Sequence, residues 1–169
     1  MTYIKDLERV HALLDDIFLD HQKALLHFEF EEALSLLEMY ESILIRHMQD
    51  EELVLLPVYS ERAAFSGAGS PKHFFDDHEK MRSYVEVFKE KVGELESELD
   101  TDKALLQLLD REAFYLRLCS HHDKRETDFL YPILEKILSD DEERELMSQI
   151  DLDADRASIV RGGGTGGKR

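Results

Sequence analysis

Two segments of the chain each carry a histidine and a glutamate one helical turn apart, on the face that should meet a hydrophobic core. The first is HMQDEELVLLP at 47–57, with His47 and Glu51, and the second is HDKRETDFLYP at 122–132, with His122 and Glu126. Residues four apart on an α-helix differ by about 40° around its axis, so each pair projects from one face. Burial of an unpaired carboxylate is costly unless a cation or strong donors compensate for it. The spacing therefore predicts metal ligands.

The two segments belong to an internal repeat with an offset of 75 residues. Both copies read Y-x6-H-x3-E-x5-P, with Tyr40 matching Tyr115 and Pro57 matching Pro132. The chain has only three prolines, and two of them fall at this offset, so chance is a poor explanation. The repeat predicts two helices built to one plan.

The apolar pattern predicts the elements that carry these residues. Apolar side chains recur at steps of three and four along the chain, which indicates an all-α protein. We expect helices over 3–27, 30–58, 71–99 and 102–138, with Ser70 capping the third and Asp100 or Thr101 the fourth. Four long helices joined by short turns predict an antiparallel up-down-up-down four-helix bundle.

The bundle should occupy residues 1–138 as one domain. The sequence SDDE at 139–142 reads as a capping box that opens a short extra C-terminal helix, so residues 139–160 are expected to form a helical extension. The glycine-rich segment RGGGTGGKR at 161–169 is expected to be a flexible tail.

Antiparallel hairpins predict which histidines share one level of the bundle. His11 and His47 are each 18 residues from a turn near residue 29, and His78 and His122 are each 22 residues from a turn near residue 100. Together with the two glutamates they form a ligand set for two divalent cations bridged by carboxylates. Imidazole with carboxylate suits iron, manganese or zinc, and the single cysteine, Cys119, argues against an iron–sulfur cluster. We favour iron.

Three other polar residues lie on the expected core face. His21 is about 15 Å along the helix from His11, too far for the same cluster, so we expect a hydrogen-bonded core histidine. Tyr40 and Tyr115 are expected to pack in the core with a hydroxyl partner. The alternative is that the two tyrosines bind a ligand of the metal or line its route inward.

These ligands and their intervals resemble the hemerythrin family, specifically the bacterial HHE cation-binding domains. The resemblance covers about residues 3–138. It implies that His11 and His47 ligate one iron and that His78 and His122 ligate the other. It further implies that Glu51, Glu126 and an oxo or hydroxo group bridge the two irons, with a site for dioxygen.

The sequence departs from the oxygen-carrying hemerythrins in two places. Those proteins have an aspartate five residues after the last histidine, where this chain has Thr127 after Glu126. They also have two histidines four residues apart on the third helix, whereas His73 and His78 are five apart, or about 140° on a regular helix. His73 remains a candidate fifth histidine ligand, the alternative being a polar residue of the first helical turn. The departures favour the sensing, stress and iron-handling branch of the family.

The expected function is therefore binding or sensing of dioxygen, nitric oxide or peroxide by a di-iron centre, in oxidative or nitrosative stress or in iron handling. The alternative is a di-iron enzyme or iron donor that reduces peroxide or nitric oxide, or repairs iron centres. Either would work with an electron donor or a signalling protein. A ferritin-like oxidase is disfavoured, because that architecture needs Glu-x-x-His on two helices and only Glu8 with His11 fits.

Charge and composition bound the remaining possibilities. The net charge of −17, from 38 acidic and 21 basic residues, disfavours nucleic acid and anionic membrane surfaces as partners. A chain of 169 residues is long enough for one sizeable core. No apolar run approaches a membrane span, the N-terminal segment is unlike a signal peptide, and one cysteine fits a reducing compartment. The cytoplasm is the expected location.

Overall fold

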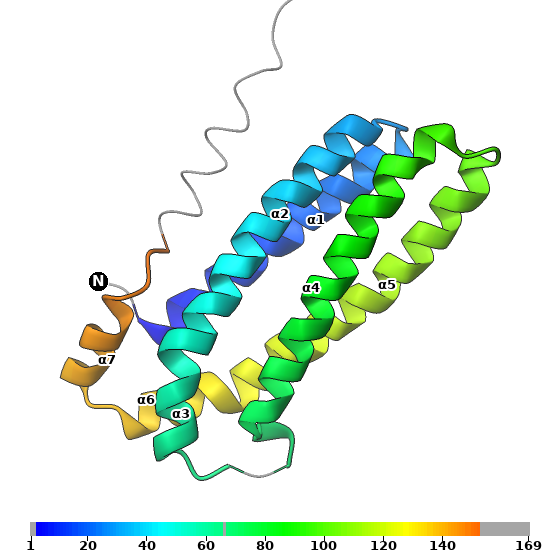
Figure 1. Ribbon diagram of the computed structural model, residues 1–169. Coiled ribbons are helices and arrows are strands. Elements are labelled where there is room, and N and C mark those ends of the chain that lie inside the picture. The colour runs from blue at the N-terminus through cyan, green and yellow to red at the C-terminus, as the bar shows by residue number, and fades with distance from the viewer. Residues whose placement is uncertain (1–2, 66, 153–169) are drawn as a thin grey trace, which may run out of the picture.

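The computed structural model describes residues 3–65 and 67–152, and all regular structure within these ranges is helical. Figure 1 shows long helices lying side by side in a bundle, with consecutive helices running in opposite directions. The long elements are α1 (Glu8–Leu26), α2 (Phe30–Asp50) continued by η2 (Glu51–Leu55) and α3 (Leu56–Arg62), α4 (Pro71–Glu94), and α5 (Thr101–Arg125) continued by η5 (Glu126–Leu130) and α6 (Tyr131–Ile137). The expected all-α class is confirmed.

Short 3-10 turns flank these helices. They are η1 (Ile4–Leu7), η3 (Gly67–Gly69) and η4 (Leu95–Ser97). The second helical stretch runs on to Arg62, four residues beyond the expected end, because Pro57 lies in the first turn of α3, where its missing N–H costs no hydrogen bond.

The turn between α1 and α2 closes without glycine or proline. Phe28 adopts a left-handed φ of 59°. The Glu29 amide donates to the Ala24 carbonyl at 3.0 Å and the Phe28 amide donates to the Leu25 carbonyl at 3.1 Å, which is a Schellman motif. A non-glycine residue can occupy this conformation at some energetic cost, which explains why the sequence carries no clear turn signal here.

The expected helix caps are formed in part. The Asp100 carboxylate accepts a hydrogen bond from the Lys103 amide, and Ser139 with Glu142 forms the expected capping box of α7 (Asp140–Met147). Ser70 precedes α4 and Pro71 opens it, but the Ser70 side chain accepts no hydrogen bond from the helix. The expected tail at 161–169 and the end of the extension lie outside the described residues.

The core is divided into two apolar clusters along the bundle. The larger one fills the half near the α1–α2 turn and includes Phe18, Leu37 and Phe88. The smaller one fills the other end, where Ile4, Tyr59 and Phe74 meet residues of α6 and the segment after α7. The ligands predicted from the sequence come from positions between these two clusters.

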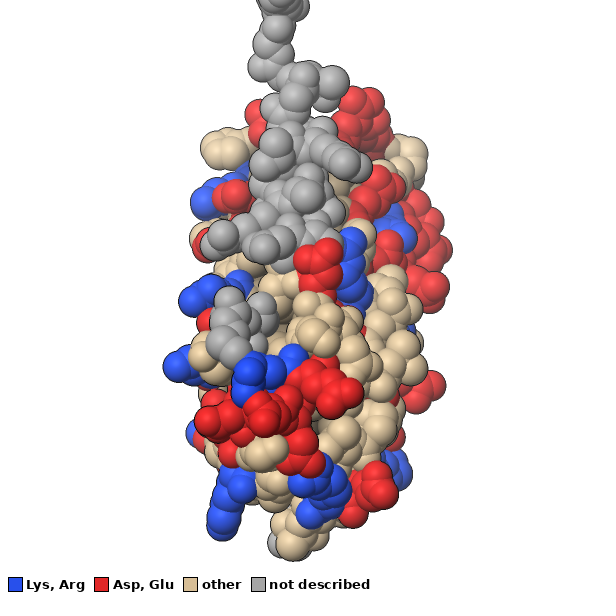
Figure 2. Space-filling view, turned by 90° about the vertical axis from the view of Figure 1, so that its left-hand side faces the viewer, with Lys and Arg blue, Asp and Glu red and all other residues tan. Residues whose placement is uncertain are grey.

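Acidic side chains outnumber basic ones in the chain, 38 to 21. Figure 2 shows them gathered in groups on the face toward the viewer, with basic side chains scattered between. Within the described part of the chain, no helix combines the length and apolar character needed to cross a membrane.

Candidate metal centre

Six predicted ligands meet in one layer across the bundle. Five of them are buried and one, His11, is half-buried. The six are His11 of α1, His47 of α2, Glu51 of η2, His78 of α4, His122 of α5 and Glu126 of η5. Each long helical stretch thus contributes at least one side chain to the layer.

The first group of ligands joins α1 and α2 to the two glutamates. The Nε2 atoms of His11 and His47 are 2.8 Å apart. Glu126 Oε2 lies 3.1 Å from His11 Nε2, and Glu51 Oε1 lies 3.6 Å from His47 Nε2. Two nitrogens bound to one ion at about 2.1 Å and at right angles would be about 3 Å apart, so the spacing fits a shared ion.

The second group joins α4 and α5 to the same two glutamates. The Nε2 atoms of His78 and His122 are 3.1 Å apart. Glu51 Oε2 lies 3.3 Å from His78 Nε2, and Glu126 Oε1 lies 2.6 Å from His122 Nε2. In each group all four donor atoms lie within 4.8 Å of one another, so each could hold a metal ion.

Both glutamates are shared between the groups. Each turns one carboxylate oxygen toward the first histidine pair and the other oxygen toward the second. Glu51 Oε2 and Glu126 Oε1 are buried and face His78 Nε2 and His122 Nε2 at the distances given above. Two buried carboxylates that each face both histidine pairs fit a pair of cations, because a cation supplies the compensation that burial of their charge requires.

Two π-turns position the glutamates. The Leu56 amide donates to the Glu51 carbonyl and the Tyr131 amide donates to the Glu126 carbonyl, so both bonds span five residues. The turns thus begin at the two shared ligands, at equivalent places in the repeat. Such turns are rare and often mark functional sites.

Proton affinities in the layer follow from burial and mutual charge. Burial disfavours the charged form of His11, but its hydrogen bond and attraction to Glu126 outweigh burial and raise its pKa to about 9. The same competition raises the pKa of His122 above its usual range and lowers that of Glu126. Burial lowers the pKa of His47. His11 and His122 therefore hold protons that a metal ion would have to displace.

Carboxylates outside the layer lie next to the outer ring nitrogens of the second histidine pair, and one of them is close enough to orient its ring. Glu52 Oε1 lies 2.8 Å from His78 Nδ1 and accepts a hydrogen bond from Arg82 at 2.8 Å. Asp77 Oδ2 is bound by Arg125 and lies 3.6 Å from His122 Nδ1, which is an electrostatic contact but too long for a hydrogen bond. Such carboxylate partners fix the ring orientation of a metal-ligating histidine and increase its basicity.

Tyr131 is a residue of the centre that the sequence did not predict. Its buried hydroxyl lies 3.0 Å from Glu51 Oε1 and 3.1 Å from Glu126 Oε2. On a regular helix a residue five after Glu126 would lie about 140° away. The π-turn brings Tyr131 over Glu126. The only signal for this turn in the sequence is Pro132, which comes directly after Tyr131.

The tyrosine pair lies on the opposite side of the layer from Tyr131. The Tyr40 and Tyr115 hydroxyls are 2.6 Å apart, which is the hydroxyl partner expected for each. Tyr40 also lines a cavity of about 20 Å³ together with His11, His47 and His122. The structure thus places one of the two tyrosines next to the candidate ligands.

His73 is not brought into either group. It is exposed in the first turn of α4, whereas His78 on the same helix is buried in the layer. The fifth histidine ligand therefore has no support from the geometry of the described residues.

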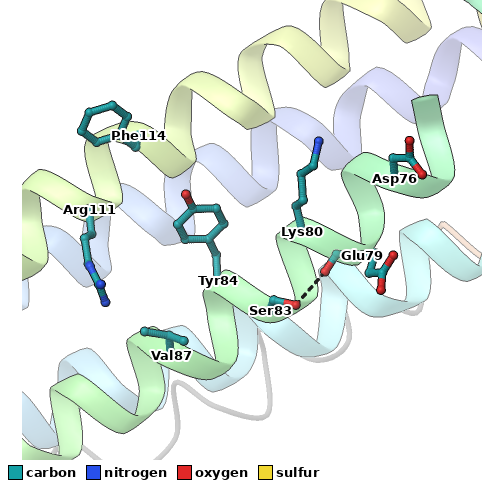
Figure 3. A pocket seen from close by; sticks show the side chains of 8 residues that line it. All are labelled: Asp76, Glu79, Lys80, Ser83, Tyr84, Val87, Arg111 and Phe114. Carbon is teal, nitrogen blue, oxygen red and sulfur yellow. Dashed lines mark hydrogen bonds between the residues drawn. The ribbon is translucent and has the colours of Figure 1, made fainter. Parts of the chain in front are cut away.

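A separate groove lies on the outer surface between α4 and α5. Its volume is about 570 Å³, and its lining includes Lys80, Tyr84, Val87, Arg111 and Phe114. Figure 3 shows Tyr84 projecting from α4 toward α5, which carries Arg111 and Phe114. The groove contains none of the predicted metal ligands. The candidate metal centre is therefore the layer in the bundle interior and not this groove.

Comparison of the chain with protein-family models, curated proteins and solved structures finds no match.

Proposed function

We propose that this chain is a non-haem di-iron protein of the hemerythrin-like type that binds or senses dioxygen, nitric oxide or peroxide. The observation that supports this best is the sharing of Glu51 and Glu126 by two four-residue groups. Two imidazoles and two carboxylate oxygens per ion suit iron, with manganese or zinc less favoured. When bound, a carboxylate-bridged iron pair supplies reversible redox chemistry and coordination positions for a small ligand.

The arrangement of the helices supports the same proposal. One histidine pair comes from α1 and α2, the other from α4 and α5, and the glutamates lie on the two helical stretches that carry the repeat. This is the assignment that the resemblance to the hemerythrin family implies. The family itself and an oxo or hydroxo bridge are part of the proposal.

The cavity beside the layer limits the size of the ligand. Its volume of about 20 Å³ compares with roughly 10–15 Å³ needed to hold one water. A molecule of two or a few atoms therefore fits next to His11 and His47. The Tyr40 hydroxyl on the cavity wall would orient it by a hydrogen bond, and Tyr115 would hold that hydroxyl in place.

Handling of iron itself is the second candidate function. The cavity lining includes the exposed Asp15 and also Asp123, whose Oδ1 lies 3.9 Å from Nδ1 of the half-buried His11. A cation that enters here meets two carboxylates before it reaches the buried ligands. This acidic approach favours exchange of iron with a donor or acceptor.

The proposal is tested by anaerobic purification, metal analysis and optical spectroscopy. We expect two irons per chain and oxo-bridge bands after oxidation. A reversible oxygenated spectrum would support carriage or sensing, whereas turnover of peroxide or nitric oxide would support the enzyme, and transfer of iron to an acceptor protein would support iron delivery. A chain that binds no iron under these conditions contradicts the proposal.

A further inference from the structure

We propose that the Tyr131 hydroxyl oxygen is an additional metal ligand at the position held by His11 and His47. The inference rests on the proposed function, because it assumes that a ferric ion occupies this position. It adds a phenolate to the imidazole and carboxylate ligands that the sequence predicts.

The geometry that carries the inference is a closed ring of five donor atoms. Starting at His11 Nε2, the contacts run to His47 Nε2 at 2.8 Å, to Glu51 Oε1 at 3.6 Å, to Tyr131 Oη at 3.0 Å, to Glu126 Oε2 at 3.1 Å and back to His11 at 3.1 Å. The Tyr131 oxygen therefore lies between the two carboxylate oxygens that face the first histidine pair. It touches neither of the oxygens assigned to the second pair.

The ring has fewer protons than it needs to hydrogen-bond every contact between Tyr131 and the two carboxylates. A phenol has one proton, so Tyr131 can donate a full hydrogen bond to only one of the two carboxylate oxygens. The other contact then brings two oxygen lone pairs together where water cannot reach, since Tyr131, Glu51 and Glu126 are buried. A cation among these oxygens replaces the unfavourable contact with attraction.

Only one of the two copies of the repeat carries a tyrosine at the place of Tyr131. At the offset of 75 residues, the counterpart of Tyr131 is Leu56, which also precedes a proline. Leu56 is fully buried in the smaller apolar cluster and offers no donor atom. The two metal positions are therefore chemically different, because only the position held by His11 and His47 has a phenolate ligand.

Coordination by Tyr131 is a ligand exchange without electron transfer. The phenol O–H bond breaks, the oxygen–metal bond forms, and the proton leaves to solvent. An anionic oxygen ligand favours the ferric over the ferrous ion, because its negative charge stabilises the higher positive charge. The first position is then the harder of the two to reduce.

The experiment loads the full chain with iron, oxidises it and records the visible and resonance Raman spectra. We expect a phenolate-to-iron charge-transfer band with enhanced tyrosine ring modes, which shift when the protein contains ring-deuterated tyrosine. Tyr131→Phe should abolish the band and keep two irons per chain. Tyr59→Phe is the matched control, since the buried Tyr59 hydroxyl donates to the Gly69 carbonyl instead of a carboxylate.

Each outcome bears on a different claim. Two bound irons without the band, or a band that persists in Tyr131→Phe, overturns the tyrosine ligand and leaves the di-iron proposal intact. A wild-type chain that binds no iron overturns both. If Tyr131→Phe does not fold, the isotope-sensitive band is recorded after each of the other five tyrosines is replaced in turn by phenylalanine, and its presence in all five variants identifies Tyr131 as the ligand.

Discussion

At the scale of single residues, the proposed function depends on the two carboxylates that face both histidine pairs. Replacing Glu126 with glutamine keeps the volume of the side chain but removes its charge and one carboxylate oxygen. We expect Glu126→Gln to lose metal at both positions, because its two oxygens contact one group each. Metal analysis after gel filtration measures the loss.

His78→Ala is the control for this prediction. His78 belongs to the second group only, so this variant should keep the ion at the His11 and His47 position. If Glu126→Gln loses one ion and retains the other, Glu126 is an ordinary ligand of a single metal and does not bridge.

The histidine pKa values predict how metal uptake depends on pH. Attraction to Glu126 overcomes burial and raises the pKa of His11 to about 9, so this ring holds its proton at pH 7 in the metal-free protein. Metal binding must release that proton, and affinity should therefore rise with pH until about pH 9, above which His11 is already neutral. Calorimetric titration in buffers of different ionisation enthalpy counts the released protons. Uptake without proton release at pH 7 would contradict the protonated state.

Four of the six residues in the layer could be predicted because they recur at one helical turn in two copies, and His11 and His78 because antiparallel hairpins place them at the same level. His47 with Glu51, and His122 with Glu126, are spaced by one helical turn, and the repeat doubles the signal. Glu52, Asp77 and Tyr131 could not be predicted. Their roles depend on contacts between different helices, or on a local change of helical pitch, that no spacing in one segment records.

At the scale of elements, each of the two π-turns contains one residue more than an α-helical turn would. The α-helix that follows keeps the orientation that it would have after a regular turn. A π-turn places residue i+5 where an α-helix places residue i+4. Deleting the exposed Asp128 should therefore convert η5 into an α-helical turn with Tyr131 still over Glu126. The ion pair that is lost, Lys124 with Asp128, is exposed and contributes little to stability. We expect the melting temperature to change by only a few degrees.

Deletion of Asp110 from the regular part of α5 is the matched control. Asp110 is also exposed, but its removal rotates the preceding segment by about 100° and moves Leu105 and Leu108 out of the core. Each buried leucine contributes roughly 1.5–3 kcal/mol, so this variant should be strongly destabilised. Thermal unfolding compares the two, and equal losses would argue against the π-turn as an insertion.

At the scale of the whole molecule, the ligand layer interrupts the hydrophobic core. The apolar periodicity predicted the bundle and placed the four predicted histidines at one level. It could not predict that the core would separate into two clusters on either side of them. That separation results from a layer of five buried polar side chains and the half-buried His11, so the bundle depends on whatever compensates the charge of this layer.

A separate buried pair, His21 with Glu112, shows what a compensated polar site in this bundle looks like. His21 Nδ1 donates to the Ala33 carbonyl at 2.7 Å, and its Nε2 lies 2.9 Å from Glu112 Oε1, while Gln22 donates to Glu112 Oε2 at 3.0 Å. This confirms the expected hydrogen-bonded core histidine. Both ring nitrogens are occupied by these contacts, so none is left to bind a cation.

This pair ties α1 to α2 and α5, and its contribution should be independent of metal. We expect Glu112→Ala to cost about 3–5 kcal/mol, because it leaves a buried imidazole without its partner, and to lower the melting temperature by roughly 10 °C. Its metal content should equal that of wild type, and a chelator should lower the stability of both proteins by the same amount. Calorimetry with metal analysis measures both quantities. If Glu112→Ala also lost its metal, the two polar sites would be coupled through the core, and the layer could not be treated as a separate unit.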